Sequence, residues 1–257
     1  MPVQEPGMNL GGQRVLITGG ASGIGLSLAR ALQMQGNEVV VCGRDADKLR
    51  AATQALPGLK AFRCDLTQDD DLVALVNQMR AEGGLSLLVN NAALQFNGAF
   101  GAGQDESVLL EILQEIDTNF SAPVKLTALC LPLLRASRES AVLNITSGLG
   151  FWPKKSAPVY CATKAGLHMF SQALRDQLAG DPRNPQIFEA VLPLVETDMT
   201  RGRGHPRFKL SAERVAADIL SGLTRNRTEM HLGGVKALMV LQRLAPSLPA
   251  RLLRNGL

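Results

Sequence analysis

Arg14-Val15-Leu16-Ile17-Thr18-Gly19-Gly20-Ala21-Ser22-Gly23-Ile24-Gly25 is the stretch of the chain that decides its fold. A short apolar run comes first, glycines follow at once, and apolar residues then recur at helical spacing as far as Leu32. This order predicts a strand, a tight turn and a helix. Glycines let the backbone approach a pyrophosphate closely, and the free N–H groups of the helix N-terminus can bind it. We therefore expect a dinucleotide site here, with an ordinary glycine-rich turn as the alternative.

A second informative group lies in the middle of the chain and consists of Ser147, Tyr160 and Lys164. Tyr160 and Lys164 are four residues apart, so their side chains project from the same face of a helix. A free phenol titrates near ~10, and a neighbouring ammonium lowers that pKa because it stabilises the phenolate. Ser147 ends an apolar run and would hydrogen-bond an oxygen whose charge changes. The group indicates an acid/base centre for carbonyl and alcohol interconversion, with a solvated surface pair as the alternative.

Apolar runs and helical patterns alternate along the chain. Strands are predicted at residues ~14–18, ~38–43, ~60–64, ~86–90, ~140–146 and ~186–192, and helices at ~23–35, ~45–55, ~69–81, ~106–135 and ~158–179. The alternation predicts an α/β fold with a single Rossmann-type, doubly wound parallel sheet that carries helices on both faces. The chain has 257 residues, of which 46% are apolar and 19% charged, and is long enough for one large core.

The motifs taken together resemble the short-chain dehydrogenase/reductase family over residues ~8 to ~232. The landmarks are Thr-Gly-x-x-x-Gly-x-Gly from Thr18, Asn90-Asn91-Ala92, Asn119, Ser147 and Tyr160-x-x-x-Lys164. The resemblance implies that Ser147 orients a carbonyl and that Tyr160 is the general acid/base. It also implies that Lys164 lowers the Tyr160 pKa and binds the nicotinamide ribose, and that Asn119 holds a water in the proton relay. More loosely, the C-terminal end looks like reductases of the DltE-like subgroup.

The same resemblance implies a set of cofactor contacts. They fall on Thr18, Gly19, Ser22, Gly23, Ile24, Gly25, Arg44, Asp65, Leu66, Asn91, Ala92, Tyr160, Lys164, Val195 and Thr197. An NAD-preferring site generally has an acidic residue at the end of the second strand, where this chain has Gly43. Arg44 follows, and a guanidinium can bind a 2′-phosphate through two hydrogen bonds. We therefore predict NADP(H), with an exposed arginine that caps a loop as the alternative.

Charge is distributed unevenly along the chain. Residues 1–198 hold 16 basic and 20 acidic residues, whereas residues 199–257 hold 11 basic and 3 acidic ones. This asymmetry indicates an anionic partner, such as an anionic or carrier-linked substrate or a lipid surface, and solvated surface charge is the alternative. We expect residues 1–234 to form the catalytic domain, with its NADP(H)-binding part at the N-terminus, and residues 235–257 to form an apolar, basic tail. That tail would pack on a partner subunit, cover the substrate cleft or lie on an anionic membrane, and packing on protein is favoured.

The cysteine, histidine and aromatic content of the chain restricts the compartments and partners that we expect. Four dispersed cysteines and three unclustered histidines predict neither a disulfide frame nor a metal site. No export signal or membrane-spanning run is visible, so we expect a cytoplasmic protein with at most peripheral membrane contact. One Trp and one Tyr argue against nucleic-acid binding. The sequence thus predicts an NADP(H)-dependent oxidoreductase that is at least a homodimer and acts on a carbonyl or alcohol. A catalytically idle redox sensor that binds a dinucleotide is the alternative.

Overall fold

A computed structural model of the chain describes residues 7–98, 100, 106–205, 207, 209–245 and 247–254. The strands are β1 (Arg14–Thr18), β2 (Glu38–Gly43), β3 (Lys60–Arg63), β4 (Leu87–Asn90), β5 (Ala141–Ser147), β6 (Gln186–Leu192) and β7 (Glu229–His231). The helices are α1 (Gly23–Gln33), α2 (Ala46–Ala55), α3 (Asp69–Ala81), α4 (Ser107–Ile116), α5 (Ala122–Ala136), α6 (Pro158–Leu178), α7 (Ala212–Thr224), α8 (Gly234–Leu244) and α9 (Ser247–Leu253).

These strands form one parallel sheet, as the alternating pattern predicted. The strand order is β3-β2-β1-β4-β5-β6-β7, and every pair is parallel. All seven residues of β5 are buried, because a strand covered on both faces has no solvent side. Four of them are apolar, and the buried Asn144 and Thr146 side chains hydrogen-bond Ser171 and Glu189. The order reverses between β1 and β4, and ligands of such sheets bind at the carboxyl ends of the strands beside this reversal.

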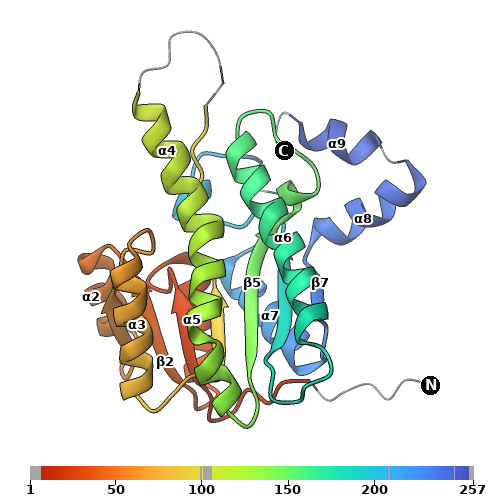
Figure 1. The fold of residues 1–257 in the computed structure, drawn as a ribbon. Coiled ribbons are helices and arrows are strands. Elements are labelled where there is room, and N and C mark those ends of the chain that lie inside the picture. Colours follow the sequence, from red (N-terminus) through yellow and green to blue (C-terminus); the bar gives the residue numbers. More distant parts are fainter. Residues whose placement is uncertain are drawn as a thin grey trace, which may run out of the picture.

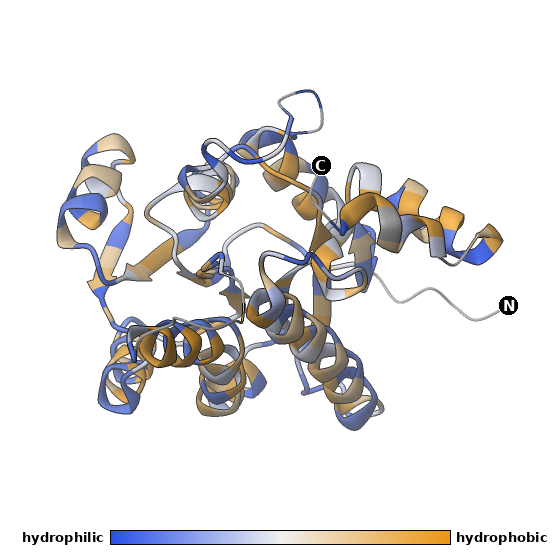
Figure 2. Ribbon diagram, turned by 90° about the horizontal axis from the view of Figure 1, so that it is seen from above, coloured by the Kyte–Doolittle hydropathy of each residue, from blue (hydrophilic) through white to orange (hydrophobic). Residues whose placement is uncertain are grey.

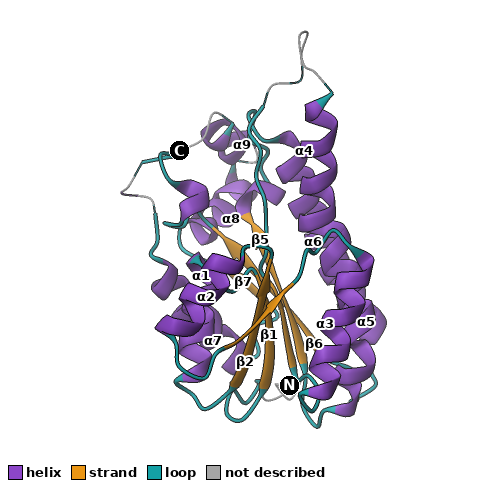
Figure 3. Ribbon diagram, turned by 90° about the vertical axis from the view of Figure 1, so that its left-hand side faces the viewer, coloured by secondary structure: helices purple, strands orange, loops and turns teal. Residues whose placement is uncertain are grey.

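Helices cover both faces of the sheet (Figure 3). Buried residues of α1, α2 and α7 join the core on one face, and those of α3 and α5 join the core on the other, with Leu178 of α6. Large side chains such as Leu28 and Leu75 are completely buried. Burying a leucine side chain contributes about 1.5–3 kcal/mol, so these two cores fix the sheet that positions the site.

The long helix predicted at residues ~106–135 is continuous but irregular. Between α4 and α5 the chain makes a π-helical turn at Asp117–Ser121. Asn119 lies in this turn and is completely buried. Single π-turns occur frequently at functional sites because they re-aim a side chain within a helix.

The C-terminal residues form two helices, α8 and α9, above the carboxyl edge of the sheet (Figure 1). Val235 and Leu253 pack with Trp152 and Val191 in a small separate core. Seen from above, the two helices at the right of Figure 2 carry apolar and polar residues side by side. The exposed apolar residues include Val240 and Leu244. Among the described residues, no helix combines the length and apolar character needed to cross a bilayer.

Candidate active site

A cavity of about 740 Å³ opens at the carboxyl edge of the sheet, where the strand order reverses. Its volume is within the range of about 300–1,000 Å³ that is usual for small-molecule and cofactor sites. The glycine loop after β1 forms one side of it, and the loop after β6 forms another. Ser147, Tyr160 and Lys164 line the same cavity. The two motifs that the sequence analysis identified separately therefore meet in one site.

The glycine loop has the backbone that a dinucleotide cradle requires. Gly19 has a φ of +63°, which favours glycine, and a side chain there would lie 2.9 Å from Ala92 Cα. A Cβ on Gly25 would lie 2.5 Å from the Gly19 carbonyl oxygen, so this glycine lets α1 pack tightly on the loop. Ser22 makes no side-chain cap, and the first turn of α1 has no acidic residue. The N–H groups at this helix end therefore remain available for a phosphate.

Thr18 and Asn91 hold the loop against β4. The Thr18 hydroxyl oxygen accepts hydrogen bonds from the backbone N–H groups of Asn91 and Ala92, both at 3.0 Å. The Asn91 side chain donates to the carbonyl oxygens of Thr18 and Gly19. Thr18 lies behind the cavity wall, so its role in this structure is to fix the two strand ends that form the wall.

The catalytic candidates come from β5 and α6. Ser147 ends β5, and Tyr160 and Lys164 lie one turn apart on α6. The Ser147 hydroxyl lies close enough to the Tyr160 phenol to lower its pKa. Lys164 is 2% exposed, and its Nζ donates to the Ile145 carbonyl oxygen at 2.9 Å. The same Nζ lies 5.8 Å from the centre of the Tyr160 ring.

The electrostatics of this group differ from the sequence-based expectation. Burial raises the pKa of Tyr160 to about 12, and the hydrogen bond from Ser147 opposes this effect. Burial lowers the pKa of Lys164 to about 8, and the Glu189 carboxylate acts in the opposite direction. The expected lowering of the Tyr160 pKa by Lys164 is not present. Desolvation is the largest cause for both groups, because burial disfavours the charged phenolate and the charged ammonium alike.

Both the oxygen and the nitrogen of the Asn119 side-chain amide form hydrogen bonds with other protein atoms. Its Oδ1 accepts from the Leu94 N–H at 2.7 Å, and its Nδ2 donates to the Leu94 carbonyl oxygen at 2.8 Å. Nδ2 also donates to Thr163 Oγ1 on α6. Asn119 thus joins the π-turn to the cavity wall at Leu94 and to the helix that carries Tyr160. A water-holding role remains an implication of the resemblance.

The other end of the cavity carries the features that the sequence analysis connected with cofactor choice. Gly43, Arg44, Asp65 and Leu66 line it. A Cβ built on Gly43 meets no atom within 4 Å, so the position where an acidic residue would stand is open space. Arg44 is exposed at this end and is therefore able to reach a negatively charged ligand.

Comparison with known proteins places this geometry in a family. Residues 13–207 match the family model described as short chain dehydrogenase. The chain belongs to the short-chain dehydrogenase family. It is therefore an oxidoreductase, and its substrate is a small molecule. The uncharacterized oxidoreductase DltE of Bacillus subtilis (strain 168) is 39% identical over 228 residues, which cover 87% of this chain and 89% of that protein. The expected likeness to DltE is confirmed.

Solved structures of short-chain dehydrogenases share the fold. One from Burkholderia cenocepacia J2315, in complex with NADP, has a TM-score of 0.83 and 21% identity and covers 96% of this chain and 99% of its own. Another from Sphingobium yanoikuyae, in complex with NADPH, has a TM-score of 0.75 and 26% identity. It covers 91% of this chain and 94% of its own. The Rossmann-type sheet predicted from the sequence is confirmed.

Most of the predicted site residues of this short-chain dehydrogenase lie in the cavity wall. Three do not: Thr18, Gly25 and Asn119 support the wall from behind. The wall also contains residues that motif spacing did not identify, among them Lys154, Val235, Leu238 and Leu253. The apolar ones come from α8 and α9, so these helices border the cleft, one of the arrangements considered for the C-terminal tail. Lys154 could have been suspected from the sequence, because it lies between Ser147 and Tyr160.

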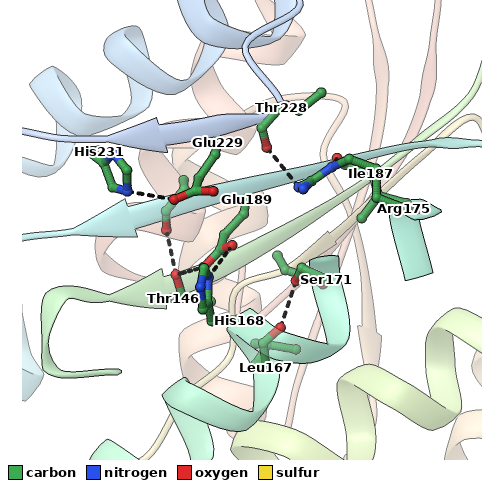
Figure 4. Close-up of polar contacts among 12 residues, drawn as sticks. Thr146, Leu167, His168, Ser171, Arg175, Ile187, Glu189, Thr228, Glu229 and His231 are labelled. Atoms are coloured by element: carbon green, nitrogen blue, oxygen red, sulfur yellow. Dashed lines mark hydrogen bonds and ion pairs between the residues drawn. The ribbon is translucent and has the colours of Figure 1, made fainter. Parts of the chain in front are cut away.

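A polar cluster lies behind α6 (Figure 4). Glu189 of β6 is completely buried, and its Oε1 accepts from the Thr146 hydroxyl at 2.5 Å. Its Oε2 lies 2.8 Å from His168 Nδ1. The Phe151 ring packs on the His168 ring with centroids 4.4 Å apart. This cluster therefore joins the sheet to the helix that carries Tyr160 and Lys164.

Proposed function

We propose that the protein is an NADP(H)-dependent oxidoreductase that interconverts a carbonyl and a secondary alcohol. The observation that carries this proposal is the position of Ser147, Tyr160 and Lys164, which line the same cavity as an uncapped, glycine-lined helix N-terminus. One cavity thus offers a phosphate cradle and a proton donor. The NADP and NADPH named for the Burkholderia and Sphingobium proteins support this cofactor class.

The residues divide the chemistry between them. NADPH, when bound, supplies the hydride to the carbonyl carbon. Tyr160 gives its proton to the carbonyl oxygen, and its raised pKa keeps the phenol protonated at neutral pH. Ser147 hydrogen-bonds the oxygen that gains charge. Lys164 would bind the ribose hydroxyls, and Asn119 would hold the wall at Leu94. Solvent then returns a proton to Tyr160.

Cofactor preference is proposed from the open position at Gly43 and from Arg44. A carboxylate at this position would accept from the ribose hydroxyls of NAD and repel a 2′-phosphate. The chain has space there instead, with a guanidinium beside it. Asp65 lines the same cavity and would meet the adenine.

The proposal is tested by a screen of ketones, aldehydes and oxo acids for loss of NADPH absorbance. A carbonyl compound that is reduced by the wild-type protein, and not by the Tyr160→Phe variant, supports it. A protein that binds NADPH tightly but reduces nothing in a broad screen would favour the redox-sensing alternative.

We also propose that the enzyme is a homodimer and that it works in the cytoplasm. Helix α4 exposes Leu109, Leu110 and Leu113 by 58%, 63% and 55%, and Met169 of α6 is 61% exposed. These helices match those that form the dimer interface in the family. Light scattering should give twice the chain mass, and Leu110→Arg should lower it to one chain. The compartment is proposed from four buried free thiols, which are usual in reducing surroundings.

A further inference from the structure

Positive charge gathers at the substrate end of the cavity. Lys154, from the loop between β5 and α6, and Arg203, from the loop after β6, both line the cavity that contains Ser147 and Tyr160. Arg203 lies near enough to Tyr160 to influence its pKa, which it lowers. An anionic ligand group between these two cations would therefore lie beside the reacting oxygen.

The Arg203 guanidinium is incompletely paired. Its Nη1 is buried and has no hydrogen-bond partner among the described residues. Its Nη2 makes one long hydrogen bond of 3.5 Å to the carbonyl oxygen of Gln95. A buried N–H group without an acceptor costs free energy, and a guanidinium has five N–H donors but no acceptor. An acceptor that the ligand brings would remove this cost.

Lys154 and Arg203 interact electrostatically, and neither has a counterion among the described residues. Burial lowers the pKa of Lys154, and Arg203 lowers it further, so the two charges repel each other. In the described part of the chain, neither residue forms an ion pair with an acidic side chain. Arg201 in the same loop is different, because it pairs with Asp198 and is 82% exposed. Two like charges that face a cavity without a partner are typical of a site that binds an anion.

Apolar side chains line the same cavity. Leu149, Val235, Leu238 and Leu253 all line the cavity. A substrate that fits must therefore combine a small anionic group with an aliphatic part. A carboxylate suits this site better than a phosphate dianion, since removing a single charge from water costs less.

We propose that the substrate is an oxo acid whose carboxylate binds between Arg203 and Lys154 while its aliphatic chain packs on Val235 and Leu238. This inference rests on the proposed function, and it adds the chemical class of the substrate. It also gives Arg203, one of the basic residues that follow β6, a role other than solvated surface charge.

A kinetic comparison of acids with their neutral esters tests the inference. The substrates are the 2-, 3- and 4-oxo derivatives of hexanoate and their methyl esters. With the wild-type protein we expect kcat/KM to be at least about 10-fold higher for an acid than for its ester in at least one pair. Arg203→Gln and Lys154→Gln should each lower this acid-to-ester ratio by about 10- to 150-fold, the range for a charge-assisted hydrogen bond.

Arg201→Gln is the matched control, because it removes an arginine of the same loop that does not line the cavity. It should leave the acid-to-ester ratio unchanged. If the esters are reduced as well as the acids, or if both cavity variants keep the wild-type ratio, the inference is wrong while the oxidoreductase proposal stands. If Arg203→Gln raises the KM for NADPH equally with every substrate, Arg203 binds the cofactor instead. That result would also overturn the inference.

A binding experiment without turnover separates this inference from the proposed function. Hexanoate and hexanamide are titrated into the protein with NADP⁺ present, and calorimetry gives both Kd values. We expect hexanoate to bind at least about 10-fold more tightly, with an advantage that shrinks at high salt and disappears in Arg203→Gln. Equal Kd values for hexanoate and hexanamide would contradict the anion site, whether or not any carbonyl compound is reduced.

Discussion

His168 Nδ1 of α6 lies 2.8 Å from Glu189 Oε2 of β6, although Glu189 is completely buried in the sheet (Figure 4). This contact raises the pKa of His168, chiefly through the hydrogen bond. The same carboxylate raises the pKa of Lys164, four residues earlier on the helix, against the larger effect of burial. Glu189 thus supplies negative charge behind the catalytic helix, which favours the protonated form of both side chains.

The first prediction concerns Glu189→Gln. Loss of the carboxylate removes the interaction that raises the Lys164 pKa, so that pKa should fall below its present value of about 8. On the proposal that the Lys164 ammonium binds the ribose, kcat/KM for NADPH should decline as pH rises through the Lys164 pKa. The alkaline limb of this profile should move to lower pH in the variant. A lowered kcat/KM with an unmoved limb would show that Glu189 acts only on packing.

Glu115 of α4 provides a stability test. Its side chain is buried, its Oε1 has no hydrogen-bond partner among the described residues, and burial raises its pKa to about 7. A glutamate in the unfolded chain has a pKa near ~4.3. Glu115 therefore lowers the free energy of unfolding progressively as pH rises from there to about 7. Glu115→Gln should therefore stabilise the protein by about 1–3 kcal/mol at pH 8 and by almost nothing at pH 4. Chemical denaturation at both pH values measures this difference.

The control for this test is Glu111→Gln, one turn earlier on the exposed side of α4. It removes only the weaker charge repulsion that Glu111 exerts on Glu115. Its effect should stay below about 0.5 kcal/mol, as is usual for surface substitutions. Equal effects of the two variants would mean that net charge, and not burial of Glu115, is responsible.

Cofactor preference should change at Gly43 and Arg44. Arg44→Ala should raise the KM for NADPH by about 10- to 150-fold and barely affect NADH, since it removes a charge-assisted pair with the 2′-phosphate. Gly43→Asp should lower the KM for NADH and raise the KM for NADPH, because the position is open and the new carboxylate would meet the ribose. Steady-state kinetics with both cofactors measures this. Equal losses with NADPH and NADH in Arg44→Ala would contradict the NADP(H) proposal.

Arg63→Ala is a suitable control for the cofactor experiment. Arg63 donates to the Arg44 carbonyl oxygen but does not line the cavity. Arg63→Ala should therefore change the KM values for NADPH and NADH by the same factor. If Arg63→Ala raises the KM for NADPH selectively, as Arg44→Ala is expected to do, then the local positive charge, and not one contact, selects the 2′-phosphate.

The sequence predicted those parts of the fold and site that depend on local spacing. The glycine turn at Gly19 and the Tyr160–Lys164 pair are of this kind, because backbone geometry alone determines where they lie. Lys154, Val235 and Leu253 could not be placed in the cavity, since chain folding brings them there from three separate loops and helices. The high pKa of Tyr160 was also missed, because it depends on burial, which spacing does not reveal.

The most direct test of the central claim is the turnover number of Tyr160→Phe, measured with the best carbonyl substrate and saturating NADPH. The substitution removes the transferable proton and keeps the ring. We predict a loss in kcat of about 10²- to 10⁴-fold, the range for general acid–base catalysis, with a Kd for NADPH close to that of the wild-type protein. Normal turnover by Tyr160→Phe would contradict the account of this site.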